Sequence, residues 1–387
     1  MSEPIRKIAI LTGSRADYGL LYHLISACHQ DELIDLQLIV TGMHLSPTCG
    51  YTISQIKKDG FPIAETLEML LDSDSEVGVA KSIGLGIVGF ADVFRRLDPD
   101  IIVLLGDRFE ILAAATAASM GRRFLAHIHG GESTEGAIDE SIRHSVTKMS
   151  HFHFPSTQAY AGRIARMGEN PAHIFVFGAP GLDYVYRADR LSSEALSQDF
   201  GVPVNHNTAL VTFHPATLDG EGDVGPLLRA ISQTNLNCIF TGSNADMHGR
   251  SINQAIQEFV KQSGDRHRFV ITLGSQRYLS CLSHIGLIIG NSSSGLIEAP
   301  TFGLPVVNIG DRQRGRIRGE NVIDAELSEA SILDAIQTAR DPEFRQKAAA
   351  ASNPYNPLNL TDISWRIKEV LKALPLSVEV LKKRFFD

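Results

Sequence analysis

Residues 285–299 read IGLIIGNSSSGLIEA, and this stretch decides how the chain is expected to fold. The apolar run predicts a buried strand, NSSSG a turn and LIEA the start of a helix. The first N–H groups of such a helix have no internal partner and favour an anion, and serine hydroxyls add donors. Glu298, one turn in, suits the hydroxyls of a sugar. The motif predicts a nucleotide-diphosphate cradle, and the alternative is an ordinary capped turn.

The same alternation of strand and helix runs through the chain and predicts an α/β protein with parallel sheets. A first series of strands is expected at Lys7–Leu11, Asp35–Val40, Ile101–Leu105, Phe124–His129, His151–Phe154 and Ile174–Phe177. A second series is expected at Thr208–Thr212, Leu236–Phe240, Arg268–Ile271, Leu287–Ile289 and Val306–Asn308.

A polar stretch from about Asp183 to His206 separates the two series, so we place a domain junction there. We expect two Rossmann-like domains, 1–183 and 184–360, that face a cleft, with the second binding the nucleotide. The tail 361–387 predicts one or two helices, interrupted at Pro375, that cross back to the first domain. Such sheets bind ligands at the carboxyl ends of their strands.

Composition excludes several classes of protein. The chain has 387 residues, a formal charge of −8 and 43% hydrophobic residues, which is unsuited to nucleic-acid binding and typical of a soluble globular protein. No apolar stretch in the sequence is expected to cross a membrane. The four scattered cysteines form no CxxC pair, which favours a reducing cytoplasm over a zinc site or a disulfide framework.

Polar motifs follow several of the expected strands. GSRADYG (13–19) lacks the dinucleotide fingerprint, and Arg15 within it suits a diphosphate. In GDRFE (106–110), Asp107 is either a catalytic carboxylate or a helix N-cap. In HIHGGE (127–132), the two histidines are expected to face one side of a strand, while a third metal ligand is missing and Glu132 reaches the cleft.

The segment DESIRH (139–144) predicts the start of a helix. Asp139 and Arg143 are four residues apart and therefore share a face. They form either a simple helical ion pair or a catalytic pair. His44 in TGMH and His214 in TFHP both follow strands, where histidine is structural or catalytic, and Arg312 closes the last strand.

These motifs, with GSNAD (242–246), NSSSG and GDRQRGR (310–316), resemble the UDP-N-acetylglucosamine 2-epimerase family in content and in order. The resemblance covers about residues 7–355 and is closest to the hydrolysing branch that supplies sialic acid and related nonulosonic acids. It implies the two-domain fold of the nucleotide-sugar glycosyltransferases, the GT-B fold. The branch is indicated by IDES at the helix start and by NSSSG at the serine turn.

The resemblance also implies roles for individual residues. Those expected near the sugar are Asp107, Glu132, Asp139, Arg143, His144, His44 and His214. Those expected to bind the nucleotide are Arg15, Arg108, His214, Asn244, Ser292, Ser293, Glu298 and Arg312, with Asp246 beside Asn244. No cofactor and no metal are expected. We expect a homodimer or a homotetramer that acts on UDP and a UDP-linked N-acetyl sugar and binds neither nucleic acid nor membrane.

The implied reaction is elimination of UDP to a 2-acetamidoglucal followed by hydration, with N-acetylmannosamine as the product. Which of Asp107, Glu132 and Asp139 moves which proton stays open at this point. UDP-N,N'-diacetylbacillosamine is an alternative substrate, and a GDP-linked sugar is a third. A glycosyltransferase of the same fold and a nucleotide-sugar sensor without turnover are the rival functions.

Overall fold

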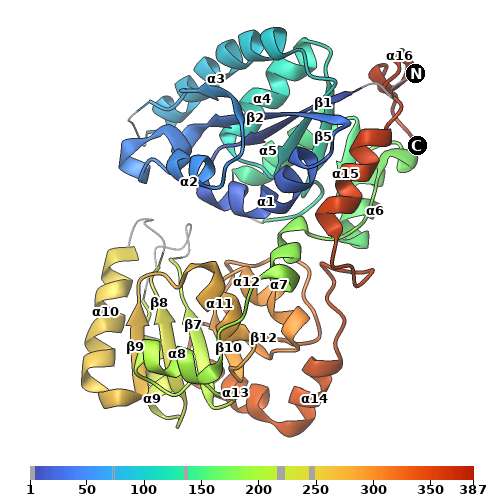
Figure 1. Cartoon of the computed structure of the whole chain (residues 1–387). Helices are drawn as coiled ribbons and strands as arrows, with labels where there is room; N and C mark the ends of the chain where they lie inside the picture. The colour runs from blue at the N-terminus through green and yellow to red at the C-terminus, as the bar shows by residue number, and fades with distance from the viewer. Residues whose placement is uncertain (1–4, 72, 74, 135–137, 216–222, 244–248) are drawn as a thin grey trace. The chain divides into compact units, whose positions relative to one another are not determined.

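The computed structural model describes residues 5–71, 73, 75–134, 138–215, 223–243 and 249–387 (Figure 1). The chain divides into two compact units. Unit 1 comprises Met1–Tyr184 and Tyr355–Asp387, and unit 2 comprises Val185–Pro354. Each unit contains one six-stranded parallel sheet, as expected for an α/β protein of the GT-B class.

The sheet of unit 1 has the strand order β3-β2-β1-β4-β5-β6. Its strands are β1 (Arg6–Thr12), β2 (Ile34–Thr41), β3 (Ile63–Leu67), β4 (Ile101–Leu105), β5 (Phe124–Ile128) and β6 (Phe152–Phe154). The chain adds strands outward on one side of β1, then returns to place β4 on the other side. This reversal makes a crevice at the carboxyl ends of β1 and β4, where ligands bind in such sheets.

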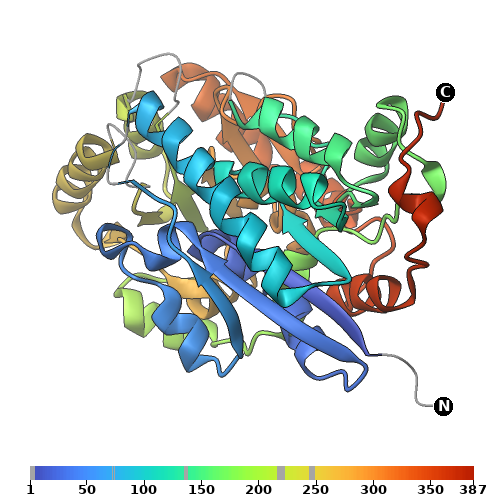
Figure 2. The same cartoon turned by 90° about the horizontal axis from the view of Figure 1, so that it is seen from above.

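Helices cover both faces of this sheet, which is why β4 is apolar along its whole length and β1 is apolar from Ile8 to Leu11. The helices of unit 1 are α1 (Arg15–His29), α2 (Ile53–Lys58), α3 (Glu76–Leu97), α4 (Phe109–Met120), α5 (Asp139–Met149), α6 (Gln158–Arg166), α15 (Ile363–Ala373) and α16 (Val378–Leu381). Residues of α3, α4 and α5 form one core with the sheet, and Figure 2 shows α3 and α4 side by side. Helices α1 and α15 pack together.

Helix α3 differs from the sequence expectation. Among the described residues it is long and apolar enough to cross a membrane by length and composition, although we expected no such stretch. A core helix of a globular unit meets the same test. Phe90 and Phe94 stack on each other inside the core of unit 1, with ring centroids 5.6 Å apart, so the apolar inner face of α3 is accounted for by packing.

The sheet of unit 2 has the order β12-β11-β10-β7-β8-β9, which repeats the pattern of unit 1. Its strands are β7 (Thr208–Thr212), β8 (Asn237–Thr241), β9 (His267–Val270), β10 (Leu287–Gly290), β11 (Val306–Ile309) and β12 (Val322–Ala325). The order reverses between β7 and β10. His214 and Asn291, which follow these two strands, therefore lie at the crevice of unit 2.

The second unit has its own set of helices. They are α8 (Ser193–Phe200), α9 (Gly225–Ser232), α10 (Gly249–Gln262), α11 (Gly274–Leu282), α12 (Ser294–Ile297), α13 (Glu329–Arg340) and α14 (Pro342–Ala350), while α7 (Asp183–Arg187) spans the unit boundary. Leu227, Ile231 and Ile332 from α9 and α13 join the strands in one buried core.

The C-terminal segment returns to unit 1, as predicted. Helix α15 packs on α1, and the buried carboxylate of Asp183 accepts hydrogen bonds from the N–H groups of Ile363 and Ser364 at 2.8 and 2.7 Å. Asp183 thereby satisfies donors at the start of α15 that have no partner within the helix. Pro375 separates α15 from α16, which confirms the expected interruption.

Three strand predictions need correction. Strands β3 and β12 were missed, because their burial alternates or is partial and the apolar run is short. The segment Ile174–Phe177 is not a strand, since only an isolated bridge joins His153 to Ile174. In addition, β5 ends at Ile128, one residue before the expected end.

Candidate active site

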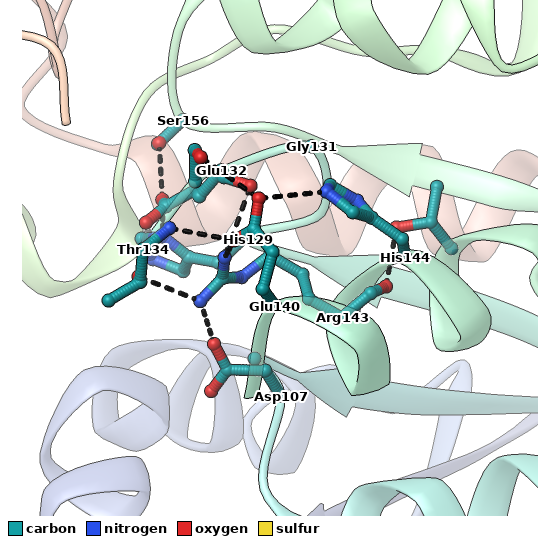
Figure 3. Close-up of polar contacts among 12 residues, drawn as sticks. Asp107, His129, Gly131, Glu132, Thr134, Glu140, Arg143, His144 and Ser156 are labelled. Carbon is teal, nitrogen blue, oxygen red and sulfur yellow. Dashed lines mark hydrogen bonds and ion pairs between the residues drawn. The ribbon is translucent and has the colours of Figure 1, made fainter. Parts of the chain in front are cut away.

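Arg143 organises the carboxyl edge of the unit 1 sheet, as Figure 3 shows. Its side chain is only 3% exposed and forms ion pairs with Asp107 and, at 2.8 Å, with Glu140. It also donates to the hydroxyl of Thr134 and to the backbone carbonyl of Glu132, both at 3.1 Å. One guanidinium thus joins the loops after β4 and β5 to helix α5. We call Asp107, Glu132, Asp139, Glu140 and Arg143 the acidic edge.

Glu140 is a member of the acidic edge that the sequence analysis did not assign. Its two oxygens accept from Ser133 and His144 at 2.9 and 3.1 Å, and from the Thr134 N–H at 2.7 Å. Partial burial acts to raise the pKa of Glu140, but these hydrogen bonds lower it. Glu140 is therefore a fixed anion that holds Arg143. The spacing of three residues between them was the signal that could have found it.

Asp139 has a different environment. Burial and the nearby carboxylate of Asp107 raise its pKa, although Arg143 and Arg108 oppose the rise. Arg143 pairs with Asp107 and Glu140, not with Asp139, so the simple helical ion pair is absent from this part of the structure. A half-buried carboxyl group with a raised pKa, at the start of a helix in the crevice, is suited to exchange a proton.

Glu132 is held by neighbours on two sides. Its Oε1 accepts from His129 Nδ1 at 2.6 Å and from the Ser156 hydroxyl at 2.8 Å. His129 has φ +64°, which turns it out of the strand that ends at Ile128. The expectation that His127 and His129 face one side is therefore wrong. His127 bonds Gly106 O at 2.8 Å and Thr147 at 3.1 Å.

His44 and His144, which were also predicted near the sugar, have different surroundings. His44 is buried, and its two ring nitrogens bond the hydroxyls of Thr12 and Thr52 at 3.0 and 2.8 Å. Burial lowers the pKa of His44 to about 4, so its ring is neutral at physiological pH. This geometry is that of a structural histidine. His144 bonds Glu140 through Nε2 and so contacts the acidic edge.

A second buried polar group lies beside the acidic edge. Glu110 is fully buried and accepts from Arg108 at 3.3 and 3.2 Å. A Cβ on Gly42 would lie 2.6 Å from its carboxylate, so this glycine leaves the space that Glu110 occupies. Asp17, in the first turn of α1, is also buried. Burial raises the pKa of Asp17 to about 6, although Arg108 opposes the shift.

Arg15 lies at the start of α1 and is exposed. No described side chain pairs with it, so its guanidinium is available to a ligand. Arg108, by contrast, is engaged with Glu110 and the sulfur of Met43, and the opposing charges raise its pKa despite burial. The role of Arg108 toward a nucleotide stays a prediction.

The carboxyl edge of the unit 2 sheet is built on Asn291. Its amide accepts from His214 N–H and donates to His214 O, both at 2.8 Å, which joins the turns after β10 and β7. Its backbone carbonyl accepts from Arg312 at 3.1 Å and from Gln313 at 2.9 Å. The predicted residues His214 and Arg312 thus meet at one point. We call His214, Asn291, Ser292, Ser293 and Arg312 the serine edge.

The helix after NSSSG is shorter than expected. Helix α12 has four residues and continues into a 3-10 turn, so its dipole is weak. Ser293 stands at its N-cap but makes no capping hydrogen bond with its side chain. Burial raises the pKa of Glu298, although the Ser294 and Tyr278 hydroxyls oppose it. Hydroxyls and backbone N–H groups, and not a long helix, are left to hold an anion here.

A groove of about 860 Å³ adjoins the serine edge. Asn291 and Arg312 line it, with the arginines at 314 and 318 on the same wall. Within the described residues, no group of three or more His, Cys, Asp or Glu side chains is arranged to hold a metal ion. The predicted nucleotide contacts Asn244 and Asp246 lie outside the described residues.

Comparison with known proteins decides the family. The profile of the family described as UDP-N-acetylglucosamine 2-epimerase matches residues 26–372. The chain belongs to this family.

Two relatives and one solved structure place it further. UDP-N,N'-diacetylbacillosamine 2-epimerase (hydrolyzing) of Legionella pneumophila is 37% identical over 383 residues, 98% of this chain and 99% of that protein. Polysialic acid biosynthesis protein P7 of Escherichia coli is 37% identical over 375 residues, 95% of each chain. The S. aureus MnaA–UDP structure matches with a TM-score of 0.75 at 18% identity, covering 95% of this chain and 96% of that one, and shows the same fold.

These findings confirm the expected family and fold. Family and relatives together make the chain a hydrolysing 2-epimerase of a UDP-linked N-acetyl sugar. The branch is that of sialic and legionaminic acid biosynthesis. The relatives of equal identity have different names, so they leave the sugar open.

Proposed function

We propose that this 2-epimerase converts UDP-N-acetylglucosamine and water into N-acetylmannosamine and UDP, and so supplies the synthesis of a nonulosonic acid. The observation that carries the proposal is the acidic edge. It combines one carboxyl group of raised pKa, Asp139, with carboxylates fixed by Arg143 and His129. Such a mixture offers a proton donor and a proton acceptor at one pH.

The reaction needs both a proton donor and a proton acceptor. The proton at C2 of an N-acetyl sugar is not acidic, so it leaves only as the bond from C1 to the UDP oxygen breaks. The proton passes to a carboxylate, UDP departs with the electron pair of the C–O bond, and 2-acetamidoglucal with a C1–C2 double bond remains. Water then adds to C1, and a proton returns to C2 on the opposite face. We assign the transfer at C2 to Asp139, with Asp107 and Glu132 as its charged neighbours.

The two units divide the work in this proposal. UDP is held by unit 2, where Ser292, Ser293 and Arg312 donate to the diphosphate and Glu298 accepts from the ribose. Unit 1 supplies the carboxylates, and Arg15 supplies a further cation for the leaving group. His214 contributes through its position beside Asn291, with which it shares two hydrogen bonds.

A second substrate has equal support from a specific observation. The Legionella pneumophila relative, named for UDP-N,N'-diacetylbacillosamine, is as similar to this chain as the Escherichia coli polysialic acid protein. The two sugars differ at C4 and C6. Incubation with each UDP-sugar, followed by identification of the released sugar, distinguishes them. Release of N-acetylmannosamine supports our first choice, whereas release of a diacetylated 6-deoxy sugar alone assigns the second.

Isotopes test the mechanism for either sugar. In heavy water the free 2-epimer is expected to carry deuterium at C2, because the enzyme carboxyl exchanges with solvent. In ¹⁸O-labelled water the label is expected at C1 of the sugar and not in UDP, because the C–O bond breaks. Retention of the original hydrogen at C2, or label in UDP, contradicts elimination and hydration. A sugar transferred only when an acceptor is added points instead to a glycosyltransferase.

A further inference from the structure

Another pocket lies in unit 1, at the C-terminal end of α5, opposite the end that carries Asp139. It has a volume of about 570 Å³. Five cations and one histidine line it, from the turn after α4, the end of α5 and the C-terminal tail: Arg122, Arg123, Lys148, Lys382, Lys383 and His151. We call it the basic pocket. None of its residues belongs to the acidic edge.

The C-terminal tail is firmly held where it forms one wall. The ring of Phe385 packs directly on Gly168, and Phe386 N–H donates to Gly168 O at 3.1 Å. Lys383 Nζ donates to the carbonyls of Lys148, at 2.6 Å, and of Ser150. These carbonyls belong to the end of α5, where the helix leaves acceptors without internal partners. The wall is therefore a built part of the unit.

The pocket is rich in positive charge although the whole chain has a formal charge of −8. Lys148 and Lys383 share one buried carboxylate, Glu169, at 2.5 and 2.7 Å. Arg123 pairs with Asp98, and Lys382 with Glu379. The guanidinium of Arg122 forms no ion pair with the described residues. Five cations thus meet three carboxylates, which leaves an excess of positive charge beside the cavity.

The backbone conformation of Arg122 also points to a role for its positive charge. Its φ is +53°, in the left-handed region that glycine and asparagine adopt more readily. The turn thus presents a cation at a position where an uncharged turn residue would be less strained.

His151 adds a neutral donor. Its Nδ1 accepts the N–H of Leu125 at 3.2 Å, which fixes the proton on Nε2. The residue is 8% exposed and lines the pocket, and no described residue accepts from Nε2. Burial lowers the pKa of His151 to about 4, so the ring is neutral at physiological pH. An N–H group at this place can donate to a ligand in the pocket.

We propose that the basic pocket binds a small molecule that carries a phosphate or carboxylate group, with Arg122, Lys382 and His151 as its principal donors. An oxyanion provides the acceptors and the negative charge that the described neighbours leave unsupplied. The same pocket touches Lys148, one residue before the end of the unit 1 helix that begins with Asp139. This inference does not depend on which sugar the enzyme uses.

Equilibrium dialysis tests the site directly. The full chain is saturated with UDP, so that diphosphate sites elsewhere are filled, and labelled inorganic phosphate or labelled citrate is added. Saturable binding of at least one probe is expected. Phosphate alone assigns a phosphate ligand, citrate alone a carboxylate ligand, and both together the shared oxyanion chemistry. The absence of saturable binding of both probes overturns the proposal.

Variants assign the binding to this pocket. The double variant Arg122→Asn with Lys382→Gln is expected to bind at least tenfold more weakly, since it removes two cations and asparagine tolerates the left-handed backbone. His151→Phe, which lacks the donor, is expected to bind more weakly as well. The control Arg95→Gln removes an exposed cation of α3 that pairs with Asp92. Equal affinity in the wild type and the double variant overturns the assignment.

Discussion

The two sheets have the same strand topology, but different kinds of side chain lie at their carboxyl edges. In unit 1 the reversal between β1 and β4 is lined by carboxylates and arginines that pair with one another. In unit 2 the reversal between β7 and β10 is lined by an amide, hydroxyls and Arg312. The fold fixes where a ligand binds, and the side chains after each strand decide what is done to it.

The difference also concerns the state of the charges. Asn291 joins the turns of the serine edge by hydrogen bonds between uncharged groups. The other donors of this edge can therefore bind an anion. In the acidic edge, Arg143 forms ion pairs with two carboxylates, Asp107 and Glu140, and the pKa of Asp139 is raised. If this contrast is functional, changes in unit 1 affect turnover and changes in unit 2 affect UDP affinity.

The largest effect is expected from Asp139→Asn. Turnover should fall roughly 10³-fold, within the range found when a general acid or base is removed, while UDP affinity stays the same. Release of free sugar and calorimetry with UDP measure the two quantities. Asp92→Asn, which alters an exposed carboxylate of unit 1, is the control and should change neither. An equal loss of UDP affinity in Asp139→Asn would remove the contrast between the units.

Arg143→Met tests whether one cation holds the acidic edge together. The change leaves Asp107 and Glu140 without their shared partner, and such breaks cost about 3–5 kcal/mol of unfolding free energy. Urea denaturation measures the loss.

Arg366→Met is the matched control for this prediction. Arg366 pairs with Asp362 at an exposed site, where an ion pair contributes about 0–1 kcal/mol. If both variants lose the same small amount of stability, Arg143 does not organise the edge.

Asp17→Asn probes the pH dependence of the same unit. The folded-state pKa of Asp17 is about 6, above its ordinary value of 3.8, so the folded protein binds the extra proton. Stability should therefore decline as the pH rises from about 4 to about 6. The asparagine variant has no ionisable group at this position. Its free energy of unfolding should therefore rise by about 3 kcal/mol relative to that of the wild type across the interval.

Denaturation curves of wild type and Asp17→Asn at pH 4 and pH 7 measure this difference. Asp223→Asn, at an exposed position of unit 2, should follow the wild type at both values. Parallel curves for Asp17→Asn and wild type at both pH values would show that Asp17 ionises normally in the folded chain.

Ser293→Ala should give the smallest effect and should appear only in binding. The hydroxyl makes no capping bond, so its loss leaves α12 intact. UDP affinity should fall by about 1–3 kcal/mol, the usual contribution of a hydrogen bond to a charged group. Calorimetry measures it, with Ser283→Ala as the control, because that hydroxyl donates to Leu279 O of the preceding helix. Unchanged affinity would take Ser293 out of the nucleotide site.

Sequence patterns predicted the architecture because buried parallel strands are continuous apolar runs. They predicted Asp107, Asp139 and Arg143 as neighbours because strand ends and a helix start converge at one edge of a sheet. They did not predict which carboxylate pairs with Arg143, because Asp139 and Glu140 lie four and three residues before it, and both spacings allow an ion pair on a helix. The orientation of His129 was not predicted either, because a residue with left-handed backbone angles produces no periodic pattern in the sequence. Strand β3 was missed since its burial alternates.

The return of the chain to unit 1 has a consequence for its synthesis. Unit 2 is one continuous segment, Val185–Pro354, whereas unit 1 lacks α15 until that whole segment has been made. At the usual pace of about 5–20 residues per second, the ribosome needs roughly 10–30 seconds for this interval. During it, the surface of α1 that α15 covers stays open to chaperones and proteases. A nascent chain stalled after Pro354 should accordingly be cut in α1 by a protease that spares the 387-residue chain.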